Sequence, residues 1–408
     1  MSTALHPLIR ILAAVGPGDA VNSFRDWASG VRTLSETSIT YTSQAYEFFV
    51  KYDIAFWVVS SHPRRERLQS GANRIENRPR IGGGRLSGIA YHMAHLAYAV
   101  SLLASAVRFR ATHAIVDSGT THWFLLWMFR AFGIEVLPNF HNVNWPEGHP
   151  PKRLARRAIL RLDSLFFKYA VRTAFGVSPA CGQQLRMMSG GRTAFHDYRA
   201  QYERSDFATL PIPGPTAPFR VLFAGRVEAD KGVFDILAIN EILNKRHPGA
   251  FAFDICGGGG ASEALAREIA ARRLAGHVVM HGKLSRPELL KVYAASHLVI
   301  VPTRSTFCEG LPMVCAEAML AGRPVVTSRI SNALEVLRGA VIEAREDDPN
   351  DYADKIAGVA ADPHLYAELV RNTATVSEQF MDPAFGLTAQ LEQWLATGGV
   401  RWRAGLHA

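Results

Sequence analysis

The chain has 408 residues, of which 48% are hydrophobic and 20% charged, a globular composition that is long enough for two or three domains. Its four cysteines are too few for a disulfide framework, and they lack the paired spacing of a cysteine-based metal site. Both observations favour a reducing compartment. The net charge of +9 is uneven, because residues 1–215 carry 25 lysines and arginines against 14 acidic residues, whereas residues 216–408 carry 20 against 22.

Apolar runs of strand length recur through the first half of the chain, at 9–15, 54–60, 114–116, 134–137 and 175–177. Strands separated by longer amphipathic segments predict an α/β domain. The first run has no long apolar region followed by a cleavage site, so we interpret it as a buried strand and not as a signal peptide. Residues 33–50 receive no assignment.

Residues 86–107 contain no Asp, Glu, Lys or Arg, and Arg85, Arg108 and Arg110 flank them. The length alone would permit a transmembrane helix. Serines, histidines and many alanines dilute the hydrophobicity, so we favour a buried or half-buried helix of a large domain, with a membrane span as the alternative.

Two clusters of basic residues give the first half its charge, one at 64–85 and one at 152–161. In the second cluster the cations alternate with leucines and isoleucine, which predicts an amphipathic helix with a cationic side. Two interpretations stay open: the helix lies on an anionic membrane surface, or it packs on the core with a solvated basic face. We expect no nucleic-acid partner, because no nucleic-acid motif accompanies the charge.

Residues 210–218 contain four prolines and a glycine, which neither a helix nor a central strand accommodates. We place the domain boundary there. The predicted organisation is an N-terminal acceptor-binding domain at 1–210, a C-terminal nucleotide-sugar-binding domain at 219–380, and a helix and tail at 381–408 that pack back on the first domain.

The second half shows the clearer alternation of strands and helices. Apolar runs at 221–224, 251–256, 277–281, 297–301 and 324–327 surround helical patterns at 233–244 and 262–273. Continuous apolar strands of this kind are typical of buried parallel sheets. The predicted fold class is therefore α/β, with two Rossmann-like doubly wound domains facing each other across a cleft, where such folds bind ligands.

Residues 225–232 join the predicted strand at 221–224 to a predicted helix. A glycine-containing turn brings backbone amides to the carboxyl edge of the sheet, and Arg226 and Lys231 add two cations. A diphosphate needs several donors and positive charge, so the loop suits a diphosphate. An ordinary solvated loop is the alternative.

A second junction between a strand and a helix occupies residues 305–319. Pro312 is well placed as the first helical residue. The amides around Gly310 and Leu311 would then point out of the helix start, where the helix dipole favours an anion.

Two carboxylates accompany this junction, Glu309 in the loop and Glu317 about two turns later on roughly the same side. Carboxylates beside an anion site make sense if they bind hydroxyl groups, such as those of a sugar and a ribose. The alternative is a capping Glu309 and a surface Glu317.

Three motifs therefore follow one another in order: Gly225-Arg226 with Lys231-Gly232, Glu309-Gly310-Leu311-Pro312 with Glu317-Ala318, and Gly322-Arg323-Pro324-Val325-Val326. Together they resemble the family 4 retaining glycosyltransferases of the GT-B fold over roughly residues 219–340. The resemblance implies that the second domain binds a nucleotide-sugar donor and the first binds the acceptor. The residues that it implies for the donor are Arg226, Lys231, Gly310, Leu311, Pro312 and Glu317, together with Gly16 of the first domain.

The resemblance also implies individual roles. Arg226 and Lys231 would bind the diphosphate, Glu309 the transferred sugar, and Glu317 the ribose. In the first domain the match is weaker: His141 follows a strand as the active-site histidine of the family does. Glu309, His141, Arg226 and Lys231 are therefore the expected catalytic residues.

Other first-domain positions resemble the family less closely. Gly16 and Gly18 correspond to its glycine loop after the first strand, and Ser178 to a serine after a later strand. Residues 329–332 stand where the family usually has two glycines, and the loop at 16–19 is poorer in glycine than usual. These departures concern the detailed sugar and acceptor contacts.

The resemblance implies a retaining, metal-independent, hexosyltransferase-like enzyme that moves sugar from a nucleotide-diphosphate sugar to a glycan or lipid-linked acceptor, in polysaccharide or glycolipid assembly. The donor is a co-substrate, and we expect neither a cofactor nor a metal. We expect a cytoplasmic location, peripheral on the inner face of the plasma membrane if the basic half meets lipid. The alternatives are another nucleotide-sugar enzyme on this fold, such as an epimerase, and a non-catalytic sugar- or membrane-binding protein.

Overall fold

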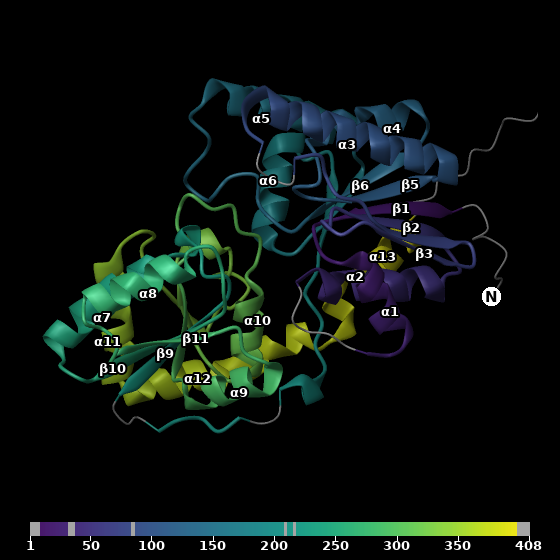
Figure 1. The fold of residues 1–408 in the computed structure, drawn as a ribbon. Coiled ribbons are helices and arrows are strands. Elements are labelled where there is room, and N and C mark those ends of the chain that lie inside the picture. Colours follow the sequence, from purple (N-terminus) through teal and green to yellow (C-terminus); the bar gives the residue numbers. More distant parts are fainter. Residues whose placement is uncertain (1–8, 32–36, 83–85, 208–209, 215–217, 398–408) are drawn as a thin grey trace, which may run out of the picture.

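A computed structural model of the protein describes residues 9–31, 37–82, 86–207, 210–214 and 218–397. Two parallel-sheet α/β domains lie side by side (Figure 1). The first contains an eight-stranded sheet in the order β3-β4-β2-β1-β5-β6-β7-β8. Its strands are β1 (Arg10–Val15), β2 (Ala55–Ser60), β3 (Glu66–Ser70), β4 (Asn73–Asn77), β5 (His113–Asp117), β6 (Glu135–Phe140), β7 (Thr173–Gly176) and β8 (Ala194–Asp197).

Helices cover both faces of this sheet. The upper layer in Figure 1 contains α3 (Gly88–Phe109), α4 (Trp127–Ala131), α5 (Leu154–Ala170) and α6 (Pro179–Ser189). The opposite layer contains α1 (Ala20–Ala28), α2 (Thr37–Lys51) and, from the far end of the chain, α13 (Leu387–Ala396). The central strands are buried on both faces, which explains their continuous apolar sequences.

The second domain has a six-stranded parallel sheet in the order β11-β10-β9-β12-β13-β14. Its strands are β9 (Phe219–Ala224), β10 (Phe251–Cys256), β11 (Val278–Gly282), β12 (Leu298–Val301), β13 (Val325–Thr327) and β14 (Val341–Glu343). Its helices are α7 (Val233–Arg246), α8 (Ser262–Ala271), α9 (Arg286–Ala295), α10 (Met313–Leu320), α11 (Pro349–Ala361) and α12 (Pro363–Ser377).

The helix α13 returns to the first domain and packs on α2. The backbone amide of Leu387 donates a hydrogen bond to the Gln44 side chain at 2.6 Å, and Lys51 forms an ion pair with Glu392 at 2.6 Å. The indole of Trp394 is almost fully buried and meets the His113 ring edge-on at 5.2 Å. The chain thus crosses between the domains twice, and the second crossing fastens its end to the first domain.

The predicted fold class is confirmed, and each predicted apolar run corresponds to a strand. The sequence pattern missed β3, β4, β8 and β14, and it left α2 unassigned. Strands β3 and β4 form an antiparallel hairpin at the sheet edge, and their polar sequences suit such an edge. Part of the proline-rich linker, at 215–217, lies outside the described residues.

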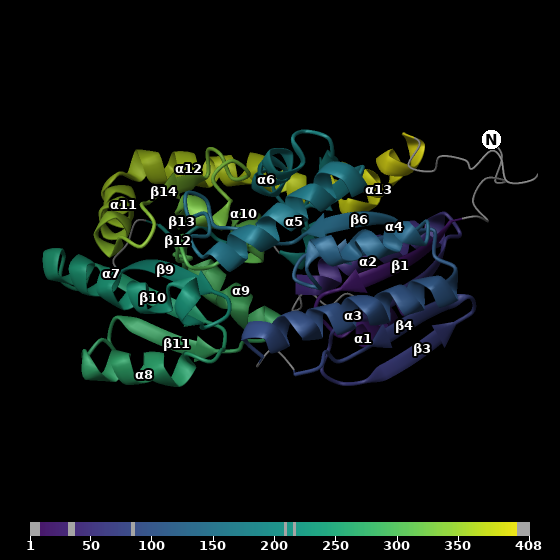
Figure 2. The ribbon, with the colours of Figure 1, turned by 90° about the horizontal axis from the view of Figure 1, so that it is seen from above.

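The uncharged segment forms α3, which is half-buried. It is the one helix of the described chain with the length and hydropathy of a membrane span, and 33% of its most apolar window is buried. One side packs into the core above the sheet through Tyr98, Leu102 and Phe109. The seen-from-above view in Figure 2 places α3, α4 and α5 together on the outer side of this domain.

Candidate active site

The loop after β9 is shaped by glycines that cannot carry a side chain. Gly232 has a φ of 75°, and a Cβ on it would lie 2.0 Å from the carbonyl oxygen of Pro302. Gly257 has a φ of 135°, and its Cβ would lie 1.8 Å from the carbonyl oxygen of Gly225. The three loops that follow β9, β10 and β12 therefore pack backbone to backbone at the carboxyl edge of the sheet.

Lys231 and Glu309 meet at this edge. The Lys231 ammonium forms an ion pair with the Glu309 carboxylate, and both side chains are largely buried. The same ammonium lies 4.2 Å from the centroid of the Phe307 ring, and the Arg226 guanidinium lies 5.8 Å from it. The structure therefore brings together three predicted residues around one aromatic ring.

Arg226 is exposed, and no acidic side chain among the described residues pairs with it. A cation beside a buried Lys–Glu pair, at the carboxyl edge of a parallel sheet, favours an anionic ligand. The predicted alternative of an ordinary solvated loop does not account for the buried Lys231.

Glu228, in the same loop, has a structural role. It carries one carboxylate oxygen that accepts a hydrogen bond from the backbone amide of Gly260 at 2.8 Å. The carboxylate thus links the loop after β9 to the loop after β10 through a hydrogen bond.

The loop containing Glu309 and Gly310 touches the first domain. The backbone amide of Val143 donates to the Glu309 carbonyl at 3.1 Å, and the Asn332 side-chain amide donates to the same oxygen at 2.7 Å. A Cβ on Gly310 would lie 1.8 Å from the His141 carbonyl oxygen. The two domains therefore meet at this point with no room for a side chain.

His141 follows β6, and its backbone carbonyl lies at this junction. Its Nε2 lies 3.2 Å from the Asp117 carboxylate and 3.1 Å from the side-chain nitrogen of Asn139. The Tyr41 ring packs against the imidazole at 5.0 Å between centroids. A small cavity of ≈ 30 Å³ next to these residues reaches Val15, at the end of β1.

Gly16 lies directly after β1, at the same carboxyl edge of the first sheet as His141. A Cβ on Gly16 would contact nothing within 4 Å, and the Gly16 carbonyl accepts a hydrogen bond from the Ser61 amide at 3.1 Å. Unlike Gly310, Gly16 is not forced to be glycine by close packing. Its expected part in donor binding remains a prediction.

Glu317 has partners other than Lys231 and Glu309. Its carboxylate lies 3.2 Å from the Arg286 guanidinium and accepts a hydrogen bond from the Tyr293 hydroxyl at 3.3 Å. Burial raises the pKa of this carboxyl, and Arg286 opposes the shift. A ribose at Glu317 would therefore also lie close to Arg286, a residue that sequence reasoning missed.

The start of α10 differs by one residue from its prediction. Pro312 is the residue before the helix, with an extended ψ of 129°, and the helix begins at Met313. Leu311 and Pro312 are half-buried beside Gly310. Asn332 was also missed: it has a φ of 57°, the left-handed conformation that asparagine tolerates, which explains how it can replace a glycine there.

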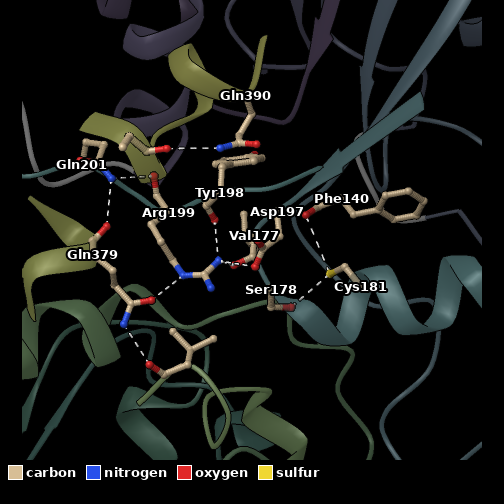
Figure 3. Close-up of polar contacts among 12 residues, drawn as sticks. Phe140, Val177, Ser178, Cys181, Asp197, Tyr198, Arg199, Gln201, Gln379 and Gln390 are labelled. Carbon is tan, nitrogen blue, oxygen red and sulfur yellow. Dashed lines mark hydrogen bonds and ion pairs between the residues drawn. The ribbon is translucent and has the colours of Figure 1, made fainter. Parts of the chain in front are cut away.

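Ser178 does not point toward the donor loop. Figure 3 shows its hydroxyl directed at Cys181 in the first turn of α6, with 3.4 Å between oxygen and sulfur. The same view shows Arg199 joining the two parts of the chain. Its guanidinium donates to Asp197 at 2.9 Å and to Gln379 at 2.8 Å.

Comparison with known proteins agrees with this geometry. Residues 211–376 match the family described as glycosyl transferases group 1. The chain is 31% identical to glycogen synthase of Mycobacterium tuberculosis over 122 residues, which covers 30% of this chain and only 28% of that protein. It is 26% identical to alpha-D-kanosaminyltransferase of Streptomyces kanamyceticus over 282 residues, covering 64% of this chain and 71% of that protein.

Similar solved structures extend over nearly the whole chain. Sucrose-phosphate synthase from Thermosynechococcus elongatus superposes with a TM-score of 0.74 at 15% identity, covering 95% of this chain and 98% of that one. Anabaena HepE, solved in complex with UDP and glucose, gives a TM-score of 0.61 at 17% identity, covering 95% and 100%. These likenesses establish the two-domain fold. The chain therefore has the GT-B fold, and its C-terminal domain matches the group 1 glycosyltransferases over residues 211–376.

Proposed function

We propose that the protein transfers a sugar from a nucleotide-diphosphate sugar to an acceptor with retention at the anomeric carbon and without a metal ion. The observation that carries this proposal is the convergence of Arg226, Lys231 and Glu309 at the carboxyl edge of the second sheet. The solved complexes of HepE with UDP, and the group 1 match, support a nucleotide-sugar donor.

The two cations would stabilise the negative charge of the diphosphate in place of a divalent metal. A departing nucleoside diphosphate gains negative charge at the bridging oxygen, and preorganised cations and amides stabilise that charge more in the transition state than in the ground state. Arg226 and Lys231 supply the cations, and the Gly310 and Leu311 amides supply neutral donors. We assign no enzyme nucleophile.

Donor binding would rearrange the Lys231–Glu309 pair. In this structure the two charges neutralise each other. A diphosphate would take over the Lys231 ammonium, which frees the Glu309 carboxylate to accept hydrogen bonds from the hydroxyls of the sugar. Glu317, held by Arg286, would accept from the ribose. Pro312 fixes the backbone where these contacts converge.

The first domain would hold the acceptor. The His141 backbone meets the Glu309 loop and its imidazole is held by Asp117, and from there the ring would contact the sugar or the acceptor hydroxyl. We propose a glycan or lipid-linked acceptor, in polysaccharide or glycolipid assembly, because the basic N-terminal half suits an anionic membrane. The location would be the cytoplasm, at the inner membrane face.

Turnover assays test this proposal. The protein is incubated with a panel of nucleotide sugars that first raise its melting temperature, since a ligand at a hundred times its Kd stabilises by about 2.7 kcal/mol. We expect release of nucleoside diphosphate that requires an acceptor, in the presence of EDTA, with the anomeric configuration of the donor kept in the product. Epimerised nucleotide sugar without acceptor would indicate the alternative enzyme, and binding without turnover the non-catalytic protein.

A further inference from the structure

The outward side of α3 is apolar along its whole length. Exposed or half-exposed positions recur with helical spacing at Ile89, Met93, Ala97, Val100, Ala104 and Val107. Ile89 is 80% exposed, and the three larger side chains after it are 43–57% exposed. A surface helix usually carries charged residues along this side, but here the first one is Arg108 in the last turn. The apolar stripe before it is therefore expected to be covered by a partner.

The neighbouring helix α5 repeats the arrangement. Its exposed apolar positions, at the same spacing, are Leu154, Ala158, Leu162, Leu165 and Tyr169. Between α3 and α5, α4 adds the half-exposed Trp127 and, at its end, Phe132. The three helices form one outer layer in both ribbon views (Figures 1 and 2). We call this surface the α3–α5 face.

The charges on this face have one sign. Cations surround the stripe of α5, and its single acidic residue, Asp163, is buried. The helix α3 has no acidic residue and ends in Arg108 and Arg110. The exposed cations of the α5 segment are Lys152, Arg153, Arg156, Arg157 and Arg161.

A basic groove continues the surface on the other side of α3. It has a volume of ≈ 480 Å³ and lies between the last turns of α3 and the β3–β4 hairpin. Four arginines line it, Arg67, Arg74, Arg78 and Arg108, against one carboxylate, Glu76, which pairs with Arg67 and Arg78. Arg74 stacks over the Trp57 ring at 5.0 Å, and no acidic side chain among the described residues pairs with it. The groove thus suits a phosphate or another small anion.

We propose that the α3–α5 face docks on an anionic lipid bilayer, with the apolar stripes in the interface and the flanking arginines on lipid headgroups. This deepens the membrane partner in the proposed function, but binding to lipid does not depend on sugar transfer. Apolar area together with cations is the combination that holds a helix in the plane of an anionic membrane.

Two other occupants fit less well. A second copy of the chain docking symmetrically would place the same cations opposite one another, which opposes association. A transmembrane α3 would have to pull Tyr98, Leu102 and Phe109 out of the core of the domain. The helix therefore lies on the membrane and does not span it.

The face adjoins the candidate active site. Arg156 of α5 donates a hydrogen bond to the carbonyl of Asn144 at 3.3 Å. That residue follows Val143, whose amide binds the Glu309 loop. A protein docked through this face would hold its cleft next to the bilayer, where a lipid-linked acceptor can enter.

Vesicle sedimentation tests the proposal with the full chain. Wild-type protein should bind vesicles of equimolar phosphatidylcholine and phosphatidylglycerol, bind weakly to pure phosphatidylcholine, and lose binding as salt rises. Val100→Glu should weaken binding roughly tenfold or more, because it removes an apolar contact and adds repulsion. The matched control is Val50→Glu, a valine of similar exposure on α2 on the opposite side of the domain, at 54% against 50%.

Lipid docking, dimerisation and failure of the donor site each predict a different result. Equal binding to both lipids, no binding at low salt, or equal losses in Val100→Glu and Val50→Glu would overturn the proposal. A dimer in light scattering that Val100→Glu dissolves would instead assign the face to a second copy and also overturn it. Nucleoside diphosphate should stabilise the wild type and Val100→Glu alike, so failure of the donor site would be seen independently.

Discussion

Lys231 and Glu309 neutralise each other in this structure, yet they are assigned to different parts of the donor. A buried ion pair of this kind is costly to break on one side only, because the remaining charge stays desolvated. Arg226 has no such partner among the described residues and is exposed. The two cations should therefore respond differently to mutation, although both are proposed to bind the diphosphate.

Arg226→Ala and Lys231→Ala should each weaken binding of nucleoside diphosphate and lower turnover. Loss of one charge-assisted contact costs about 2–4 kcal/mol, or roughly a hundredfold or more in rate. Only Lys231→Ala should also lower the free energy of unfolding, because it leaves Glu309 buried and unpaired. Calorimetry with diphosphate and with nucleoside, beside an Arg371→Ala control, is the measurement. Equal losses of both ligands would mean that the loop is structural.

Glu309→Gln should remove most turnover, and the protein should still fold but with a lower free energy of unfolding, because Lys231 loses its charged partner. The neutral amide accepts hydrogen bonds from sugar hydroxyls less strongly, and positioning of the sugar is lost. Glu317→Gln should act mainly on donor affinity, since Glu317 pairs with Arg286 and not with Lys231. The check is steady-state kinetics with saturating donor and acceptor. Full kcat in Glu309→Gln would contradict the assignment.

At the scale of elements, the sequence predicts what hydrophobic periodicity controls. Buried strands such as β10 can be predicted from a continuous apolar run in the sequence, because both of their faces are apolar. The edge hairpin β3–β4 was missed, since its residues alternate without apolar runs. The loops at 225–232 and 305–319 were located by glycine and charge, but the pairing of Lys231 with Glu309 depends on tertiary packing that no local pattern contains.

Long-range contacts explain the other omissions. Arg286 reaches Glu317 from the start of α9, and Asn332 reaches the Glu309 carbonyl from the loop after β13. Neither an arginine nor an asparagine predicts such a role from the sequence alone. The αL conformation of Asn332 could have been inferred where the family usually has glycine, because asparagine is the common substitute there.

A histidine cluster, formed by His92 and His95 of α3 with His122 of the segment before α4, makes stability depend on pH. Burial lowers the pKa of His95 and of His122 to about 4, and neighbouring cations and histidines add to the shift. The unfolded chain takes up these protons near pH 6.5, but the folded protein does not. The free energy of unfolding is therefore unaffected by these histidines above about pH 6.5 and decreases as pH falls toward about 4. At about pH 5.5 the decrease is about 1 kcal/mol per histidine.

Urea unfolding at neutral and mildly acidic pH checks this expectation, with His122→Phe as the variant. The variant should lose less free energy of unfolding on acidification than the wild type does. Asp163 changes the free energy of unfolding in the opposite direction on acidification, because burial raises the pKa of its carboxyl to about 6. It is present in both proteins, so its contribution cancels in the comparison. An identical pH dependence in both proteins would refute the assignment.

At the scale of the whole molecule, two connections fix how the domains face each other. One is structural: Arg199, buried in the first domain, bonds to Gln379 next to the returning segment (Figure 3). The other lies at the site, where the Glu309–Gly310 backbone presses against His141 and Val143. This second contact holds the residues proposed for the donor next to His141, the residue proposed for the acceptor side.

Gly310→Ala tests that contact. Its added Cβ would lie 1.8 Å from the His141 carbonyl oxygen, closer than any real contact permits, so the loop or the domain must shift. The backbone amide of residue 310 is kept, and the cations of the donor site are untouched. Diphosphate affinity should therefore change little, whereas turnover should fall about a hundredfold, as a misplacement near 1 Å can cause.

The matched control is Gly358→Ala in α11, where an added Cβ meets nothing within 4 Å and should be neutral or stabilising. Small-angle scattering in the presence of diphosphate should show a larger radius of gyration for Gly310→Ala than for wild type or control. That difference separates a blocked approach of the domains from damage confined to the donor loop. If Gly310→Ala retains wild-type turnover and dimensions, then the backbone contact seen between Gly310 and His141 is not needed for catalysis, and His141 loses the positional argument for its role.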